Sequence, residues 1–236
     1  MRADKKPYVS AVIVAAGSGT RMGGVTKPFI RLGDRTAFEM VLDAFGESAL
    51  TDEIVVVCRE SDIERFKAAA EGFDKKPLRF TVGGANRGDS VYCGVRASKG
   101  DYYAIHDCAR PLITPEQIDS VVQAAFKTGA ACAYKPVTDT VKYVDSETGT
   151  VYTPERKHLL AVQTPQVFKS EIYLVAAALA KKDGVKATDD TSLAERAGFK
   201  VEYVETGARN LKLTTAEDVL LARAIVLSDK KKGEGS

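Results

Sequence analysis

Short apolar runs alternate with amphipathic segments along most of this chain, and this alternation limits the folds that it can adopt. The apolar runs are typical of buried strands and cover residues 9–16, 54–58, 78–82, 102–106, 130–134, 201–204 and 210–213. Helical spacing of apolar residues occurs at 36–45, 62–70, 90–97, 115–126, 170–180, 190–197 and 215 to about 227. Strands that alternate with helices of this length indicate βαβ units. The sequence therefore predicts an α/β fold of three layers around a mainly parallel, twisted sheet.

One segment, about 137–158, departs from this alternation. Residues 140–144 and 150–153 have strand-like patterns, and the intervening Asp145–Gly149 has the composition of a turn. We expect a β-hairpin arm that protrudes from the sheet. A protruding arm commonly buries its apolar face against a second subunit, so we also expect a homodimer formed through this arm.

The composition is that of an ordinary globular protein and excludes several functional classes. The 236 residues carry a net charge of only +2, which argues against a nucleic-acid-binding protein. No apolar run reaches the length of a membrane span, and no secretory signal begins the chain, so we expect a cytoplasmic protein without a membrane partner. The four cysteines form no Cys-x-x-Cys pair, which disfavours a zinc site. We expect a single domain over 1–228 and a disordered polar tail over 229–236.

A glycine-rich loop, Ala15–Lys27, follows the first predicted strand. Open α/β sheets bind ligands at the carboxyl ends of their strands, and glycines allow backbone N–H groups to approach phosphate oxygens. Arg21 and Lys27 add positive charge to this loop. The loop therefore predicts a site for a phosphate chain, although a glycine-rich surface turn with solvated cations would have the same composition.

Two common phosphate-binding motifs are excluded by single positions in this loop. A P-loop requires lysine directly after its second glycine, where Val25 stands here. A dinucleotide-binding fingerprint requires a third glycine, where Met22 stands.

Three charged residues elsewhere are candidates for the same site. Asp107 ends a predicted central strand and is well placed to bind a metal or a substrate hydroxyl. Arg110 follows closely and suits a phosphate, but an ordinary Asp107–Arg110 salt bridge explains both residues equally well. Lys212 lies in a short apolar run, where lysine is rarely buried without a partner, and a phosphate ligand would supply one.

The motif Ala15-Ala-Gly-x-Gly-x-Arg-Met-Gly, followed by Lys27, resembles the signature loop of the sugar-nucleotide-type nucleotidyltransferases. Further motifs resemble the 2-C-methyl-D-erythritol 4-phosphate cytidylyltransferase family, and the resemblance extends from Ser10 to about Ile225. These motifs are Gly83–Ser90, His106–Pro111, Pro136–Lys142, Gln163–Phe168 and Asn210–Thr215. The resemblance implies a Rossmann-like nucleotidyltransferase fold. It also implies transfer of a cytidylyl group from CTP to 2-C-methyl-D-erythritol 4-phosphate in non-mevalonate isoprenoid synthesis, with pyrophosphate as the second product.

The resemblance also implies roles for individual residues. The residues that it places at the reacting phosphates are Arg21, Lys27 and Lys212. Those that it places around the nucleotide are Ala15, Ala16, Gly17, Ser18, Gly19, Gly83, Gly84, Ser90 and Asp107, with Asp107 also a ligand of Mg²⁺. Those that it places near the acceptor substrate are Arg110, Thr140, Arg156, Thr164 and Thr188, with Thr140 and Arg156 reaching the neighbouring subunit.

Some of these residues also have purely structural explanations in the sequence. Ser90 suits the cap of the helix that follows it, Arg87 and Asp89 suit an ordinary ion pair, and His106 suits a structural role. Thr188-Asp-Asp-Thr191 is by itself a helix-start signal.

One departure from the family pattern concerns Pro28. The family usually has proline before the lysine of this loop, whereas here it follows Lys27 and favours an extended Lys27 backbone. Two other functions remain open from the sequence: a ribitol-5-phosphate cytidylyltransferase, and a nucleotide-binding sensor without turnover.

Overall fold

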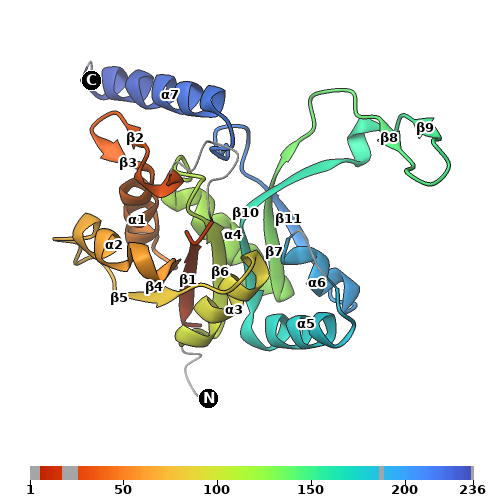
Figure 1. Ribbon diagram of the computed structural model, residues 1–236, viewed down its shortest axis with the longest axis horizontal. Coiled ribbons are helices and arrows are strands. Elements are labelled where there is room, and N and C mark those ends of the chain that lie inside the picture. Colours follow the sequence, from red (N-terminus) through yellow and green to blue (C-terminus); the bar gives the residue numbers. More distant parts are fainter. Residues whose placement is uncertain (1–5, 18–25, 186–188, 235–236) are drawn as a thin grey trace.

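The computed structural model describes residues 6–17, 26–185 and 189–234, and its centre is a seven-stranded sheet (Figure 1). The strands lie in the order β11 (Glu202–Glu205), β7 (Ala130–Pro136), β10 (Leu160–Lys169), β6 (Tyr102–Asp107), β1 (Val9–Val14), β4 (Glu53–Cys58) and β5 (Leu78–Val82). Only β10 runs antiparallel to its two neighbours, β6 and β7. The prediction of a mainly parallel sheet is confirmed.

Helices cover both faces of this sheet, as the three-layer prediction requires. One face packs against α1 (Ala37–Glu47), α2 (Ile63–Ala69) and α4 (Pro115–Thr128). The other face packs against α3 (Arg87–Ala97), α5 (Ser170–Lys182) and α6 (Thr191–Arg196). Alternate residues of β1 point to opposite layers, as the period of a strand dictates: Ile13 faces the first layer and Val12 the second.

The helix starts follow from local capping chemistry. Thr36 Oγ1 accepts a hydrogen bond from the Glu39 backbone N, and the Glu39 carboxylate accepts one from the Thr36 N, so these two residues cap α1. Thr114 caps α4 in the same way, with Pro115 in the first turn.

A third apolar cluster joins residues 30–37 to residues 213–222, near the other end of the described chain. The last helix, α7 (Ala216–Glu234), packs beside the short hairpin of β2 (Arg31–Leu32) and β3 (Arg35–Thr36) (Figure 1). Leu32 from the hairpin and Leu213 from the segment before α7 are fully buried in this cluster. No helix in the described part of the chain has the length and apolar character needed to cross a membrane.

The predicted arm is present and projects away from the sheet (Figure 1). It continues from the paired ends of β7 and β10, where Pro136 lies opposite Leu160. Its tip is the antiparallel pair β8 (Tyr143–Val144) and β9 (Val151–Tyr152), which is shorter than the predicted strands. The turn between these strands is closed by the Asp145 carboxylate, which accepts hydrogen bonds from two backbone N–H groups.

Three predictions about elements were wrong, and one strand was missed. Residues 210–213 form no strand, and instead Leu213 N makes a single backbone hydrogen bond to Ala109 O. Strand β10 was not predicted, because its polar residues and proline break the strand pattern. Helix α3 begins at Arg87 rather than Ser90. Finally, α7 continues to Glu234, so residues 229–234 are helical and not a disordered tail.

Candidate active site

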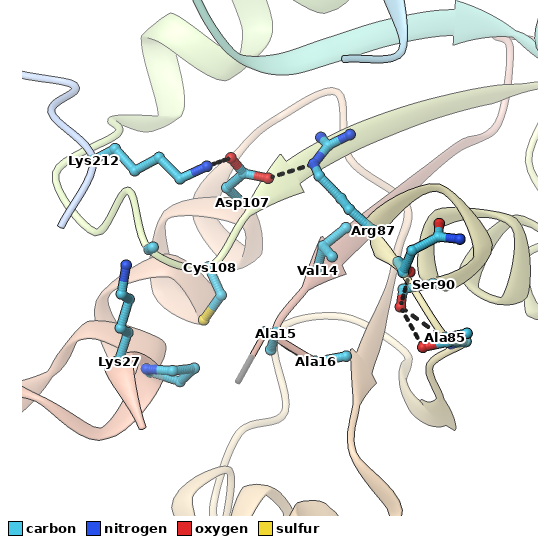
Figure 2. A pocket seen from close by; sticks show the side chains of 15 residues that line it. Val14, Ala15, Ala16, Lys27, Ala85, Arg87, Ser90, Asp107, Cys108 and Lys212 are labelled. Carbon is cyan, nitrogen blue, oxygen red and sulfur yellow. Dashed lines mark hydrogen bonds and ion pairs between the residues drawn. The ribbon is translucent and has the colours of Figure 1, made fainter. Parts of the chain in front are cut away.

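A pocket of about 410 Å³ lies at the carboxyl ends of β1 and β6 (Figure 2). The residues that line it are Val14–Gly17, Lys27, Pro28, Gly84–Arg87, Ser90, Asp107–Ala109 and Lys212. The pocket thus unites residues of the N-terminal loop with segments near residues 84–90, 107–109 and 212. Sheet-edge hydrogen bonds fix its floor: Ala15 N donates to Val57 O at 2.7 Å, and Cys108 N donates to Val14 O at 3.0 Å.

The loop between β5 and α3 forms one wall. Ser90 Oγ accepts from Gly84 N at 3.1 Å and donates to Asn86 O at 2.8 Å, which closes the loop on itself. A Cβ atom at Gly84 would lie 2.3 Å from Asp89 Cβ, so only glycine fits there. Asn86, and not Ser90, caps α3, through a hydrogen bond from Asp89 N to Asn86 Oδ1. The interpretation of Ser90 as a helix cap is therefore wrong, and Ser90 lines the pocket instead.

Asp107 lies at the centre of the charged part of the pocket, at the end of β6. Its Oδ2 is 2.6 Å from Lys212 Nζ, and its Oδ1 is 3.3 Å from Arg87 Nε (Figure 2). Burial alone would raise the pKa of this carboxyl, but the charges of Arg87 and Lys212 outweigh burial and hold the pKa below its ordinary value. Asp107 is therefore an ionised carboxylate at neutral pH.

Two lysines bring positive charge to this pocket from opposite ends of the chain. Lys212 reaches Asp107 from the segment before α7, and the Lys27 side chain extends toward the same side of the pocket (Figure 2). Lys27 is the first residue of a 3₁₀ helix, η2 (Lys27–Phe29), with Pro28 at its start. The expected extended backbone at Lys27 is therefore replaced by a 3₁₀ turn, and its side chain still lines the pocket.

Polar residues behind Asp107 hold the end of β6 in place. Thr164 Oγ1 accepts from Asp107 N at 3.1 Å and is also 3.1 Å from His106 Nδ1. Arg110 Nη1 donates to Asn210 O at 2.8 Å. His106 is fully buried, and burial is the main cause that lowers its pKa to about 4. These contacts agree with the structural role expected for His106.

The structure contains neither of the two ion pairs considered from the sequence, Asp107–Arg110 and Arg87–Asp89. The Asp107 carboxylate pairs with Lys212 and Arg87 rather than with Arg110. Arg87 pairs with Asp107 and Asp190 rather than with Asp89. Arg87 and Asp190 were missed as candidates for the site, because a cation in the first turn of α3 and an acidic residue before α6 look like ordinary helix ends.

Gly83 precedes Gly84 of the pocket wall, and its backbone N donates to Cys58 O at 2.9 Å. The other predicted residues fall into two groups. Thr140 and Arg156 belong to the arm, and Arg156 lines a separate hollow of about 610 Å³ at the base of the arm. There Arg156 Nη1 donates to Thr138 O at 2.7 Å. Within one chain, the structure does not bring these two residues to the wall of the Asp107 pocket. Ser18, Gly19, Arg21 and Thr188 lie outside the described residues.

Comparison of this sequence with known proteins shows which family the chain belongs to. The sequence model of the family described as 2-C-methyl-D-erythritol 4-phosphate cytidylyltransferase matches residues 9–228. The chain belongs to this cytidylyltransferase family. A relative of that name from Symbiobacterium thermophilum is 42% identical over 92% of this chain and 92% of its own length. Another of that name, from Caldanaerobacter subterraneus subsp. tengcongensis, is 40% identical over 91% of this chain and 96% of its own.

Solved structures of the cytidylyltransferase family share the fold. The 4-diphosphocytidyl-2C-methyl-D-erythritol synthase of Anaerococcus prevotii superposes with a TM-score of 0.85 at 30% identity, covering 94% of this chain and 97% of that one. The 2-C-methyl-D-erythritol 4-phosphate cytidylyltransferase of Thermus thermophilus gives a TM-score of 0.75 at 32% identity, covering 92% and 98%. The predicted fold class, the resemblance and the assignment as a nucleotidyltransferase enzyme are confirmed.

Proposed function

We propose that this chain transfers the cytidylyl group of CTP to 2-C-methyl-D-erythritol 4-phosphate and releases pyrophosphate. The observation that carries the proposal is the pocket at the sheet edge, in which Lys27, Lys212 and the ionised Asp107 surround space next to a glycine-containing loop. The family membership supports the choice of this acceptor over ribitol 5-phosphate. The four cysteines are all free thiols, which supports a cytoplasmic location.

The chemistry requires charge neutralisation more than proton transfer. An oxygen of the acceptor phosphate attacks the α-phosphorus in line, and the bond from that phosphorus to the pyrophosphate oxygen breaks. The attacking phosphate is already ionised at neutral pH, so no general base is needed. In this proposal Lys27 and Lys212, together with Arg21, stabilise the charge that develops on the α-phosphoryl group and on pyrophosphate.

The residues of the pocket fit Mg²⁺ as the cofactor. Mg²⁺ bound with nucleotides takes one or two carboxylates and completes its shell with phosphate oxygens and water. Asp107 supplies one ionised carboxylate on the pocket wall, and the described ranges contain no group of three or more acidic, histidine or cysteine residues that could hold a metal ion. Asp107 would hold the metal, which would neutralise phosphate charge when bound.

The arm supports a homodimer in which each arm serves the neighbouring active site. Thr140 and Arg156 do not reach the Asp107 pocket of their own chain, and the tip of the arm carries exposed apolar side chains. In this proposal, burial of the tip against the partner brings both residues to the acceptor substrate of that partner.

A pyrophosphate-release assay tests the reaction and separates the alternatives. We expect release with CTP and 2-C-methyl-D-erythritol 4-phosphate, and little with ATP, GTP or UTP. Release with ribitol 5-phosphate alone would select the other cytidylyltransferase activity, and no release with any pair would favour a sensor.

Two variants test the roles of the lysines. Lys27→Ala and Lys212→Ala should each lower kcat by about 100-fold or more, because each removes charge stabilisation from the transition state. Lys67→Ala, which changes an exposed lysine on α2, is the matched control and should retain full turnover. Near-normal turnover in both pocket variants would contradict the mechanism.

A further inference from the structure

Arg87, the first residue of α3, forms a bridge between two buried carboxylates. Its Nη1 donates to Asp190 Oδ2 at 2.7 Å, and its Nε lies 3.3 Å from Asp107 Oδ1. Asp107 and Asp190 are 8% and 2% exposed. The guanidinium therefore ties the end of β6 to the residue that precedes α6, and it ties both to the wall formed by the β5–α3 loop.

The far end of this bridge is itself fixed. Asp190 N donates to Oε1 of the buried Gln166 on β10 at 2.9 Å. Gln166 Nε2 also lies 3.4 Å from Asp189 Oδ2. Asp190 is thus tied to β10, and Arg87 is tied to the sheet through it.

Arg87 does not stabilise the start of α3. A cation in the first turn of a helix opposes the helix dipole, and the start of α3 is already satisfied by Asn86 and Asp89. A residue that breaks a local preference while making two buried contacts elsewhere is typical of functional sites.

The charged groups form an alternating chain of Asp190, Arg87, Asp107 and Lys212. In the function proposed above, Lys212 is the member that contacts substrate phosphate. When Lys212 does so, the ion pair with Arg87 still holds the Asp107 side chain in its orientation. We infer that Arg87 is a positioning residue for Asp107, and that Asp190 in turn fixes Arg87. This inference rests on the proposed function.

The geometry requires arginine rather than any cation. The two contacts use two nitrogens of the rigid guanidinium fork, whereas lysine is a single point charge that cannot reproduce both at once. Arg87→Lys is therefore expected to recover part of the function that Arg87→Ala loses.

The test measures kcat and KM for both substrates in wild type, Arg87→Ala, Arg87→Lys, Asp190→Asn and the double variant Arg87→Ala/Asp190→Asn. We expect Arg87→Ala to lower kcat by about 10- to 100-fold while KM for CTP changes by less than about threefold, because misplacement of Asp107 acts on the transition state. Asp190→Asn should lower kcat in the wild-type background and add less than about twofold in the Arg87→Ala background, since both changes break one bridge. Arg196→Ala, which removes an exposed ion pair between α6 and Asp183 at the end of α5, is the matched control and should leave turnover unchanged.

Several outcomes would overturn the inference. Turnover of Arg87→Ala within about twofold of wild type, equal losses in the lysine and alanine variants, or losses that multiply in the double variant would each contradict it. Thermal melts establish that each variant is folded, and if Arg87→Ala does not fold, the comparison of Arg87→Lys with Asp190→Asn and their combination gives the same test. An inactive wild type would contradict the proposed function itself, whereas an active wild type with insensitive variants contradicts only the bridge.

Discussion

His106 makes the stability of this protein depend on pH. It is fully buried on β6 and has hydrogen-bonding contacts to Thr164 and Arg110, and burial is the main cause that lowers its pKa from 6.5 to about 4. Between these two pH values the unfolded chain binds a proton at this histidine and the folded chain does not. Stability therefore rises with pH across this window and falls as the solution becomes more acidic.

We expect the free energy of unfolding to be about 2 kcal/mol lower at pH 5 than at pH 7.5 from this residue alone. His106→Asn should lack this part of the pH dependence, because asparagine does not titrate. Urea unfolding at both pH values, in buffer with EDTA, measures the effect, and the difference between the two proteins removes contributions that they share. An unchanged pH dependence in His106→Asn would contradict the assignment.

Gly84 is a second residue whose role follows from geometry. An alanine Cβ at this position would meet Asp89 Cβ at 2.3 Å and Asp89 backbone C at 3.0 Å, so the loop itself would have to move. Gly84→Ala should weaken CTP binding and lower stability by about 1–3 kcal/mol. Gly88→Ala in the same segment places its Cβ no closer than 3.4 Å to Asn86 Oδ1 and should be tolerated. Calorimetric titration with CTP and thermal melts compare the two variants; equal behaviour would argue against a shaped loop.

At the level of elements, the sequence predicted those whose signals are local. Helices α1 and α4 end within two residues of the predicted ranges 36–45 and 115–126, and in the structure each begins at a capping box. Strand β10 was missed because buried Gln163, Thr164 and Gln166 replace the apolar residues that indicate a strand. These polar side chains are satisfied by partners that the local sequence does not reveal, such as Asn210, which is 46 residues from Thr164 in the chain.

The same limit applies to the charged groups of the site. Asp107 was a candidate from its place after a strand, but its partners lie 20 and 105 residues away. Asp190 lies 103 residues from Arg87. Motif and spacing therefore indicated which residues lie near the pocket, whereas tertiary packing decided which of them pair.

The tip of the arm exposes two aromatic side chains that a dimer would bury. The Tyr143 and Tyr152 rings pack with centroids 4.9 Å apart, yet these residues are 49% and 53% exposed in a single chain. If the tip is buried in a dimer, Tyr143→Ala/Tyr152→Ala removes the largest apolar side chains of that contact. We expect the variant to elute with a mass near the 25.4 kDa of one chain and the wild type with twice that mass.

Light scattering coupled to size-exclusion chromatography provides this measurement. Glu147→Ala, at the exposed turn of the arm, serves as the matched control and should remain dimeric. Turnover should fall with the dimer fraction, because the partner arm supplies Thr140 and Arg156 in the proposed arrangement. A wild-type mass of one chain with full activity would contradict the role of the arm.

The whole molecule explains why the site lies where it does. Strands β1 and β6 are neighbours in the middle of the sheet, and their carboxyl ends form the pocket floor. The alternation of strands and helices predicted this edge, since parallel sheets bind ligands there. It predicted a strand at 210–213, whereas in the structure this segment is irregular and brings the candidate residue Lys212 to the pocket wall.

The positions of Lys27 and Lys212 depend on how the two segments that carry them pack together. Leu213, next to Lys212, is fully buried in one cluster with Ile30 and Leu32, which follow Lys27 closely. Leu213→Ala should lower the free energy of unfolding by about 2–5 kcal/mol. It should also lower kcat in folded protein, because both lysines depend on this packing. Leu221→Ala on α7, where the side chain is exposed, should change neither quantity. Chemical unfolding and turnover well below the melting temperature separate the two effects. A Leu213 variant that is destabilised but fully active would show that the cluster holds the fold without aligning the lysines.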